Sequence, residues 1–72
     1  LDPQREKELR DGAFDKAQTP QGTYLCACCG MEAASRVPFQ VDHILPMNKG
    51  GKSVPENLQI LCRSCNGRKG DQ

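Results

Sequence analysis

The stretch "LQILCRSCN", residues 58–66, holds the features that decide the fold: a short apolar run followed directly by a Cys-x-x-Cys pair. The run "LQIL" predicts a short strand over residues 58–61. Two residues between two cysteines let both sulfur atoms of one turn point at the same ion. The stretch therefore predicts a strand that leads into half of a metal site.

A second pair with the same spacing, Cys26-x-x-Cys29, lies earlier in the chain and is followed by Gly30. Two such pairs supply the four sulfur ligands of a tetrahedral structural Zn²⁺ site. Disulfides or buried free thiols are the alternative, and they leave the matched spacing unexplained. Cys28 could compete in the first pair, but a glycine after Cys29 suits a tight turn around the ion. We therefore predict a structural zinc site with the ligands Cys26, Cys29, Cys62 and Cys65.

A chain of this size gains much of its stability from such a site. Its 72 residues include two phenylalanines, one tyrosine and no tryptophan, and a domain of this size buries only about 60% of the surface of its unfolded chain. Zinc binding contributes on the order of 10 kcal/mol, which is comparable with the whole stability of a small domain. An odd number of cysteines, five, fits a disulfide framework poorly. With no leading hydrophobic stretch to suggest secretion, we expect a reducing, cytoplasmic setting and no membrane contact.

The first part of the chain predicts a helix and a connection. Asp2 followed by Pro3 suits the start of a helix, and the charged run behind them predicts a helix over residues 1–18 with a thin apolar stripe. Residues 19–24, which include "TPQGT", are predicted as a linker. The core would then occupy residues 25–72.

Further strand and loop signals lie between the cysteine pairs. Val37, Phe39 and Val41 alternate with other residues at the period of a half-buried strand. A loop rich in proline and glycine follows over residues 45–57, and a connection of that length in a small domain is typical of a functional loop. The tail "RSCNGRKGDQ" is predicted to start a short helix.

Four polar residues near the cysteine pairs indicate chemistry when they are considered together: Asp42, His43, Asn57 and Asn66. Taken singly, each has a plain structural explanation at a strand end, loop end or turn. Hydrolysis of a phosphodiester, however, needs a base near neutral pH and a hard cation. Histidine has a suitable unperturbed pKa for the first task, and carboxylate and amide oxygens are ligands that Mg²⁺ accepts.

The run "DHILPMNKGGKSVPENLQILCRSCNGRKG" resembles the core of the HNH endonucleases, and the cysteine pairs resemble the zinc-stapled branch of that family. The resemblance covers about residues 25–70. It implies a small α+β fold, the ββα-metal (His-Me) finger, with a four-cysteine structural zinc and, outside the resemblance, an N-terminal helix. The activity that it implies is a divalent-metal-dependent DNA endonuclease.

The same resemblance assigns roles position by position. It implies that His43 is the general base, that Asp42 is a ligand of the catalytic cation, and that Asn57 orients His43 and braces the loop. Asn66 stands where the family often has its final histidine, so it would be the second ligand in an H-N-N variant of the motif. An amide oxygen in place of an imidazole nitrogen favours Mg²⁺ or Mn²⁺ over softer metals.

Adjacent residues in an unbroken strand point to opposite faces, so Asp42 and His43 could serve one phosphate only if the strand ends or bends there. Pro46 restricts its predecessor and cannot donate a hydrogen bond to a ladder. We therefore expect the chain to leave the sheet at His43.

The basic residues of the second half are candidate phosphate contacts, each also explained as a solvated surface charge. The few aromatic residues argue against a base-stacking platform for single strands. The resemblance to the HNH endonucleases implies double-stranded DNA as the substrate, cut on one strand per site. The alternatives are a non-catalytic zinc-ribbon module that binds nucleic acid or a protein, and an inactive nuclease domain kept for assembly. The candidate contacts are Lys49, Lys52, Arg63, Arg68 and Lys69.

Overall fold

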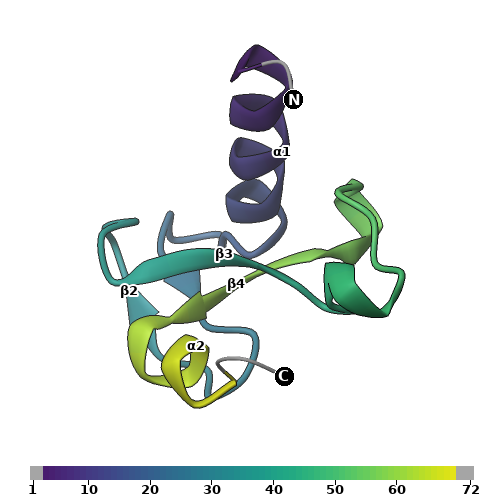
Figure 1. The fold of residues 1–72 in the computed structure, drawn as a ribbon. Helices are drawn as coiled ribbons and strands as arrows, with labels where there is room; N and C mark the ends of the chain where they lie inside the picture. The colour runs from purple at the N-terminus through teal and green to yellow at the C-terminus, as the bar shows by residue number, and fades with distance from the viewer. Residues whose placement is uncertain (1–2, 70–72) are drawn as a thin grey trace.

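The computed structural model describes residues 3–69, which form two helices and two small antiparallel sheets (Figure 1). Figure 1 shows one helix on each side of the longer sheet. No helix among these residues has both the length and the apolar character needed to cross a membrane. The predicted small α+β fold is confirmed. The elements are α1 (Pro3–Lys16), β1 (Tyr24–Leu25), β2 (Glu32–Ala33), β3 (Phe39–His43), β4 (Leu58–Cys62) and α2 (Arg63–Lys69).

The strand predicted from the alternation at Val37, Phe39 and Val41 is β3, but it begins at Phe39. Val37 lies in a turn and is 72% exposed, so its place in the strand was wrong. The turn is closed by a hydrogen bond from Phe39 N to Arg36 O at 3.0 Å, and Val37 N donates to Ser35 Oγ. β3 ends at His43, which confirms that the chain leaves the sheet there.

The core lies between α1 and the pair of strands β3 and β4. Phe14 of α1 meets Tyr24 and Phe39 edge to face, with ring centroids 5.3 Å and 6.4 Å apart. The Arg36 guanidinium lies 4.8 Å from the Phe14 ring centroid and donates to Tyr24 Oη and Asp11 Oδ1. This cation therefore holds α1 to the sheet by packing on an aromatic ring as well as by charge.

Helix α1 lies within the helix predicted over residues 1–18 but ends at Lys16, and Gln18 forms a β-bridge with Tyr24 instead. The proposed cap, Asp2, lies outside the described residues. Lys16, in the last turn, donates to the backbone oxygens of Pro55 and Leu58 at 2.7 Å and 2.5 Å. The stretch predicted as a linker forms a closed turn, in which Thr19 N donates to Thr23 O at 2.8 Å. The two hydrogen bonds from Lys16 fix α1 against the start of β4 and the segment that precedes it.

The strands β1 and β2 form a small hairpin that carries the first cysteine pair at its tip, and this hairpin was not predicted. Its tip lies along the free side of β4: Ala27 N donates to Ile60 O at 3.0 Å, and Cys62 N donates to Cys26 Sγ at 3.3 Å. Since β3 hydrogen-bonds to the other side of β4, β4 is flanked on both sides.

Alternation along β3 separates its side chains between the two helices. Phe39 packs against α1, and His43 shares that face because it lies four residues further along the strand. Gln40 and Asp42 point to the opposite face, where residues of α2 hydrogen-bond to both of them. The neighbours Asp42 and His43 therefore face different helices.

The loop before β4 contains two single-turn 3-10 helices, η1 (Met47–Lys49) and η2 (Pro55–Asn57). Gly51 lies between them, and its backbone runs so close to an earlier part of the loop that a Cβ atom would lie 1.8 Å from Leu45 O. Gly12, on exposed α1 surface, has no such neighbour within 4 Å. The two glycines thus provide a matched pair.

Replacing each of these glycines with alanine is expected to change stability in opposite directions. Gly51→Ala should lower the free energy of unfolding by about 1–3 kcal/mol, because the loop must shift to admit the methyl group. Gly12→Ala should raise it by roughly 0.5–1 kcal/mol, since alanine is the better helix former. Urea unfolding of both variants checks this, and equal shifts of the same sign would contradict the close approach at Gly51.

Candidate metal centre and active site

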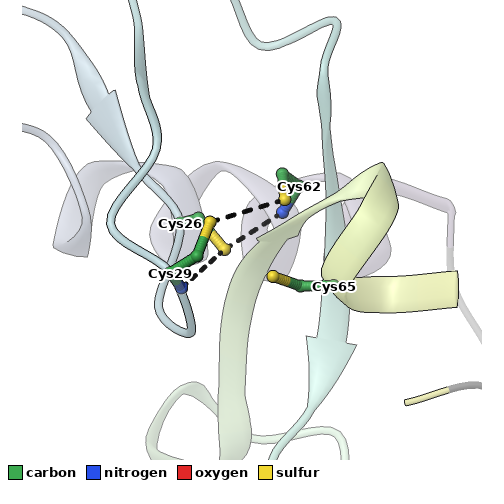
Figure 2. A group of neighbouring side chains, drawn as sticks. All are labelled: Cys26, Cys29, Cys62 and Cys65. Atoms are coloured by element: carbon green, nitrogen blue, oxygen red, sulfur yellow. Dashed lines mark hydrogen bonds between the residues drawn. The ribbon is translucent and has the colours of Figure 1, made fainter. Parts of the chain in front are cut away.

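The four cysteines of the two pairs converge on one point (Figure 2). Their sulfur atoms all lie within 4.8 Å of one another, and the Cys29 and Cys62 sulfurs are 3.8 Å apart. Two sulfurs on a tetrahedral zinc ion with bonds of about 2.3 Å would be about 3.8 Å apart. The cluster is therefore positioned to bind a metal ion, and its all-sulfur donor set fits zinc.

Backbone N–H groups around Cys26 prepare it as an anionic ligand. Burial opposes ionisation of its thiol, but N–H donors from Cys29, Cys62 and Cys28 outweigh burial and lower the pKa of Cys26 to about 6. The donor to sulfur distances are 3.3–3.5 Å. Cys26 is thus ready to bind a cation at neutral pH, because the thiolate is the form that binds metals.

Cys65 has the opposite tendency. The Arg68 guanidinium, 3.3 Å from its sulfur, favours the thiolate, but burial and the neighbouring sulfurs prevail and raise the pKa of Cys65 to about 12. Crowded sulfurs resist losing a further proton until a cation balances their charge. Cys28 is exposed and is not one of the four clustered cysteines.

His43 ends β3 with its imidazole on the α1 side of the sheet. Its Nε2 atom is 2.9 Å from Ser53 Oγ. Both residues line a groove of about 810 Å³ that also borders α1, with Phe39 and Met47 among its apolar walls. The only imidazole of the chain is therefore half-buried, reachable through a groove, and held by a hydroxyl group.

Asp42 points to the α2 side, where it is also partly buried. Its Oδ2 atom accepts hydrogen bonds from Gln59 Nε2 at 3.0 Å and from Lys69 Nζ at 2.5 Å. Lys69 Nζ also donates to the backbone oxygen of His43 at 2.5 Å. The ammonium group of Lys69 thus bridges the carboxylate of Asp42 and the backbone oxygen of His43 at the end of the strand.

Asn66 lies on the same side of β3 as Asp42. Its Nδ2 atom donates to Gln40 Oε1, which leaves its Oδ1 atom available to accept from or coordinate another group. An aspartate and an asparagine oxygen on one side of a strand are a donor set that suits Mg²⁺ or Mn²⁺, which take few protein ligands and retain waters.

Asn57 braces the loop through the backbone. Its Oδ1 atom accepts from Leu45 N at 2.8 Å, and its Nδ2 atom donates to Leu45 O and Lys52 O at 3.1 Å and 2.9 Å. Its backbone oxygen accepts from Ile44 N at 2.8 Å. Among the described residues it is Ser53, rather than Asn57, whose side chain hydrogen-bonds to His43.

The five candidate phosphate contacts fall into two groups. Lys49, Lys52 and Arg63 are exposed. Arg68 hydrogen-bonds to a cysteine of the cluster, and Lys69 is paired with Asp42. The first group is open to a polyanion, whereas the second already has partners within the fold.

Three residues of the site were missed by the sequence analysis: Gln40, Ser53 and Gln59. Gln40 could have been found, because it lies two residues before Asp42 and so shares its face. Gln59 pairs with Asp42 across the sheet, which requires the strand register. A lone serine in a loop carries no sequence signal of its own.

Comparison with known proteins adds one finding. A protein-family model described as HNH endonuclease matches residues 26–72. The matched segment contains the four clustered cysteines and all four polar residues of the candidate site. No curated protein gave a significant match.

Proposed function

Because the chain belongs to the HNH endonuclease family, we propose that it is a divalent-metal-dependent DNA endonuclease of the nicking type, with His43 as its general base. Membership of the family indicates nuclease activity in general. In this proposal the four cysteines hold a structural zinc ion. The observation that carries the proposal is the placement of His43, half-buried at the end of β3 and beside a groove.

The chemistry assigned to His43 is removal of one proton. As the oxygen of an attacking water forms a bond to phosphorus, the O–H bond breaks and its proton passes to the imidazole. The P–O bond to the sugar then breaks, and the leaving oxygen takes a proton from solvent. A positioned base of this kind contributes about 10²–10⁴-fold to the rate.

Asp42 and Asn66 would hold the catalytic cation, Mg²⁺ or Mn²⁺. When bound, such a cation stabilises negative charge on the phosphate and on the leaving oxygen. Lys69 neutralises Oδ2 of Asp42, so the carboxylate must offer Oδ1 or exchange its ammonium partner for the cation. This exchange would release Lys69 for a phosphate.

Double-stranded DNA is the proposed substrate. Phe14, Tyr24 and Phe39, which are all the aromatic residues of the chain, are buried and so cannot stack on unpaired bases. Lys49, Lys52 and Arg63 are exposed cations that could contact the phosphate backbone. These features favour a protein that grips a duplex by its phosphates.

The second candidate is a non-catalytic zinc module that binds nucleic acid or a protein. The ion pair between Asp42 and Lys69 favours it, as does the orientation of Asp42 away from His43. Nicking of supercoiled plasmid distinguishes the two. Zinc-loaded protein with added Mg²⁺ or Mn²⁺ should produce nicked circles, whereas normal DNA binding without nicking under either metal would support the second candidate.

Asp42→Asn should abolish binding of a second metal ion. The substitution keeps the shape of the side chain but removes its charge, and a neutral amide is a much poorer ligand than a carboxylate. Titration of Mn²⁺ into zinc-loaded protein, followed by the electron spin resonance of free Mn²⁺, measures this directly. Asp15→Asn, the same change on the exposed surface of α1, is the control. Equal Mn²⁺ binding by both variants would remove Asp42 from the cation site.

A further inference from the structure

The contact between His43 and Ser53 has a direction that matters for catalysis. A neutral imidazole carries one proton, and the hydrogen bond made by one nitrogen determines which nitrogen is free to act as a base. Here Ser53 Oγ lies 2.9 Å from Nε2. A serine hydroxyl can donate its proton or accept one through its lone pairs, so both arrangements are chemically available.

We propose that Ser53 is a positioning residue that accepts a hydrogen bond from Nε2–H of His43 and thereby leaves Nδ1 as the basic nitrogen. This rests on the proposed function, in which His43 takes a proton from water. A base needs a free lone pair, and Nε2 is already occupied by Ser53. Nδ1 is then the nitrogen that is available as a base. For Nδ1 to be unprotonated, the ring proton must be on Nε2, so the serine hydroxyl must accept the hydrogen bond.

Asn57 fixes the loop on both sides of Ser53 through hydrogen bonds to its two neighbours in the chain. Its Nδ2 atom donates to the oxygen of Lys52, and its backbone N–H donates to the oxygen of Val54, each at 2.9 Å. These are the residues immediately before and after Ser53. The backbone on both sides of the serine is therefore fixed. Among the described residues, its hydroxyl group hydrogen-bonds to the imidazole alone.

Asn57 also fixes the chain on the other side of His43. It hydrogen-bonds to the backbone of Ile44 and Leu45, the two residues that follow the histidine. The side chain and backbone of this one residue thus set both the direction in which His43 leaves the strand and the position of the hydroxyl that meets its ring. Asn57 orients His43 indirectly, and Ser53 is the group through which it acts.

The experiment uses the fact that the chain contains one histidine. A long-range proton–nitrogen correlation spectrum of ¹⁵N-labelled, zinc-loaded protein shows which nitrogen of a neutral ring carries the proton. At a pH where the ring is neutral, the wild type should show the Nε2–H form. Ser53→Ala should show a mixture of both forms, and Ser53→Thr, which keeps the hydroxyl, should restore the wild-type spectrum.

Kinetics of plasmid nicking provide the second readout. Ser53→Ala should lower kcat by about 10-fold to 100-fold, as expected for a misplaced reacting group, with little change in KM. Asn57→Ala should produce the same mixture of ring forms. Ser64→Ala, the same substitution on the exposed surface of α2, should change neither readout.

An Nδ1–H ring in the wild type, or an unchanged spectrum in Ser53→Ala, would overturn the inference. Absence of nicking by the wild type would instead contradict the proposed function, and the spectra would still decide whether Ser53 sets the ring proton. The two failures are therefore distinguishable.

Discussion

Stripping the zinc from the four-cysteine cluster should unfold the entire domain. The cluster joins the tip of the first hairpin to the end of β4 and the start of α2, and the remaining core is small. Zinc binding supplies on the order of 10 kcal/mol, whereas domains are stable by about 5–15 kcal/mol in total. Circular dichroism during titration with a strong chelator should show loss of both helices, with recovery when Zn²⁺ is restored.

Single cysteine variants identify the ligands. Cys29→Ser should lose zinc and unfold, whereas Cys28→Ser should keep one zinc per chain, because Cys28 is exposed and stands apart from the cluster. Metal content measured on both purified proteins decides the matter. The reverse result, with zinc retained only in Cys29→Ser, would make Cys28 the ligand.

His43→Ala should reduce nicking by about 10²–10⁴-fold, the usual contribution of a general base. The fold should survive, because the side chain lies at the end of β3 and contributes no buried contact to the core cluster. Rates of nicking at saturating Mg²⁺, together with the thermal melting curve, measure the two effects separately.

Rescue of His43→Ala by free imidazole tests whether the lost side chain acts as a base. The substitution leaves space in the groove beside Ser53, so added imidazole should restore part of the activity if the lost group acts as a base. Nicking by His43→Ala at the wild-type rate would refute the role of His43, and unfolding of the variant would show a structural role instead.

The cysteine cluster and the position of His43 at the end of β3 were predictable because strong local rules govern both. Zinc ligation requires paired sulfurs at fixed spacing, which singles out Cys26 and Cys29 without knowledge of the fold. The break after His43 followed from the proline three residues later, since proline cannot continue a strand ladder. Such constraints operate over a few residues and can therefore be read directly from the chain.

The partners of the site residues were not predictable, because they depend on the register and on the phase of a helix. Lys69 was named as a candidate phosphate contact, and its ion pair with Asp42, made from the end of α2, was not foreseen. The packing of Arg36 on Phe14 was not predicted either. A lysine or arginine can pack its methylene groups or its guanidinium plane against the protein, or it can extend into solvent. The sequence alone does not distinguish these arrangements.

The hydrogen bond from Ala27 to Ile60 has a consequence beyond the local fold. A strand edge with unpaired backbone groups is a template for pairing with another chain, and β4 is the most apolar of the strands within residues 3–69. The cysteine-bearing tip occupies that edge for as long as the metal holds it in place. A metal ion bound by the four cysteines would thus also protect against self-association, and its loss would expose a segment suited to seed aggregates.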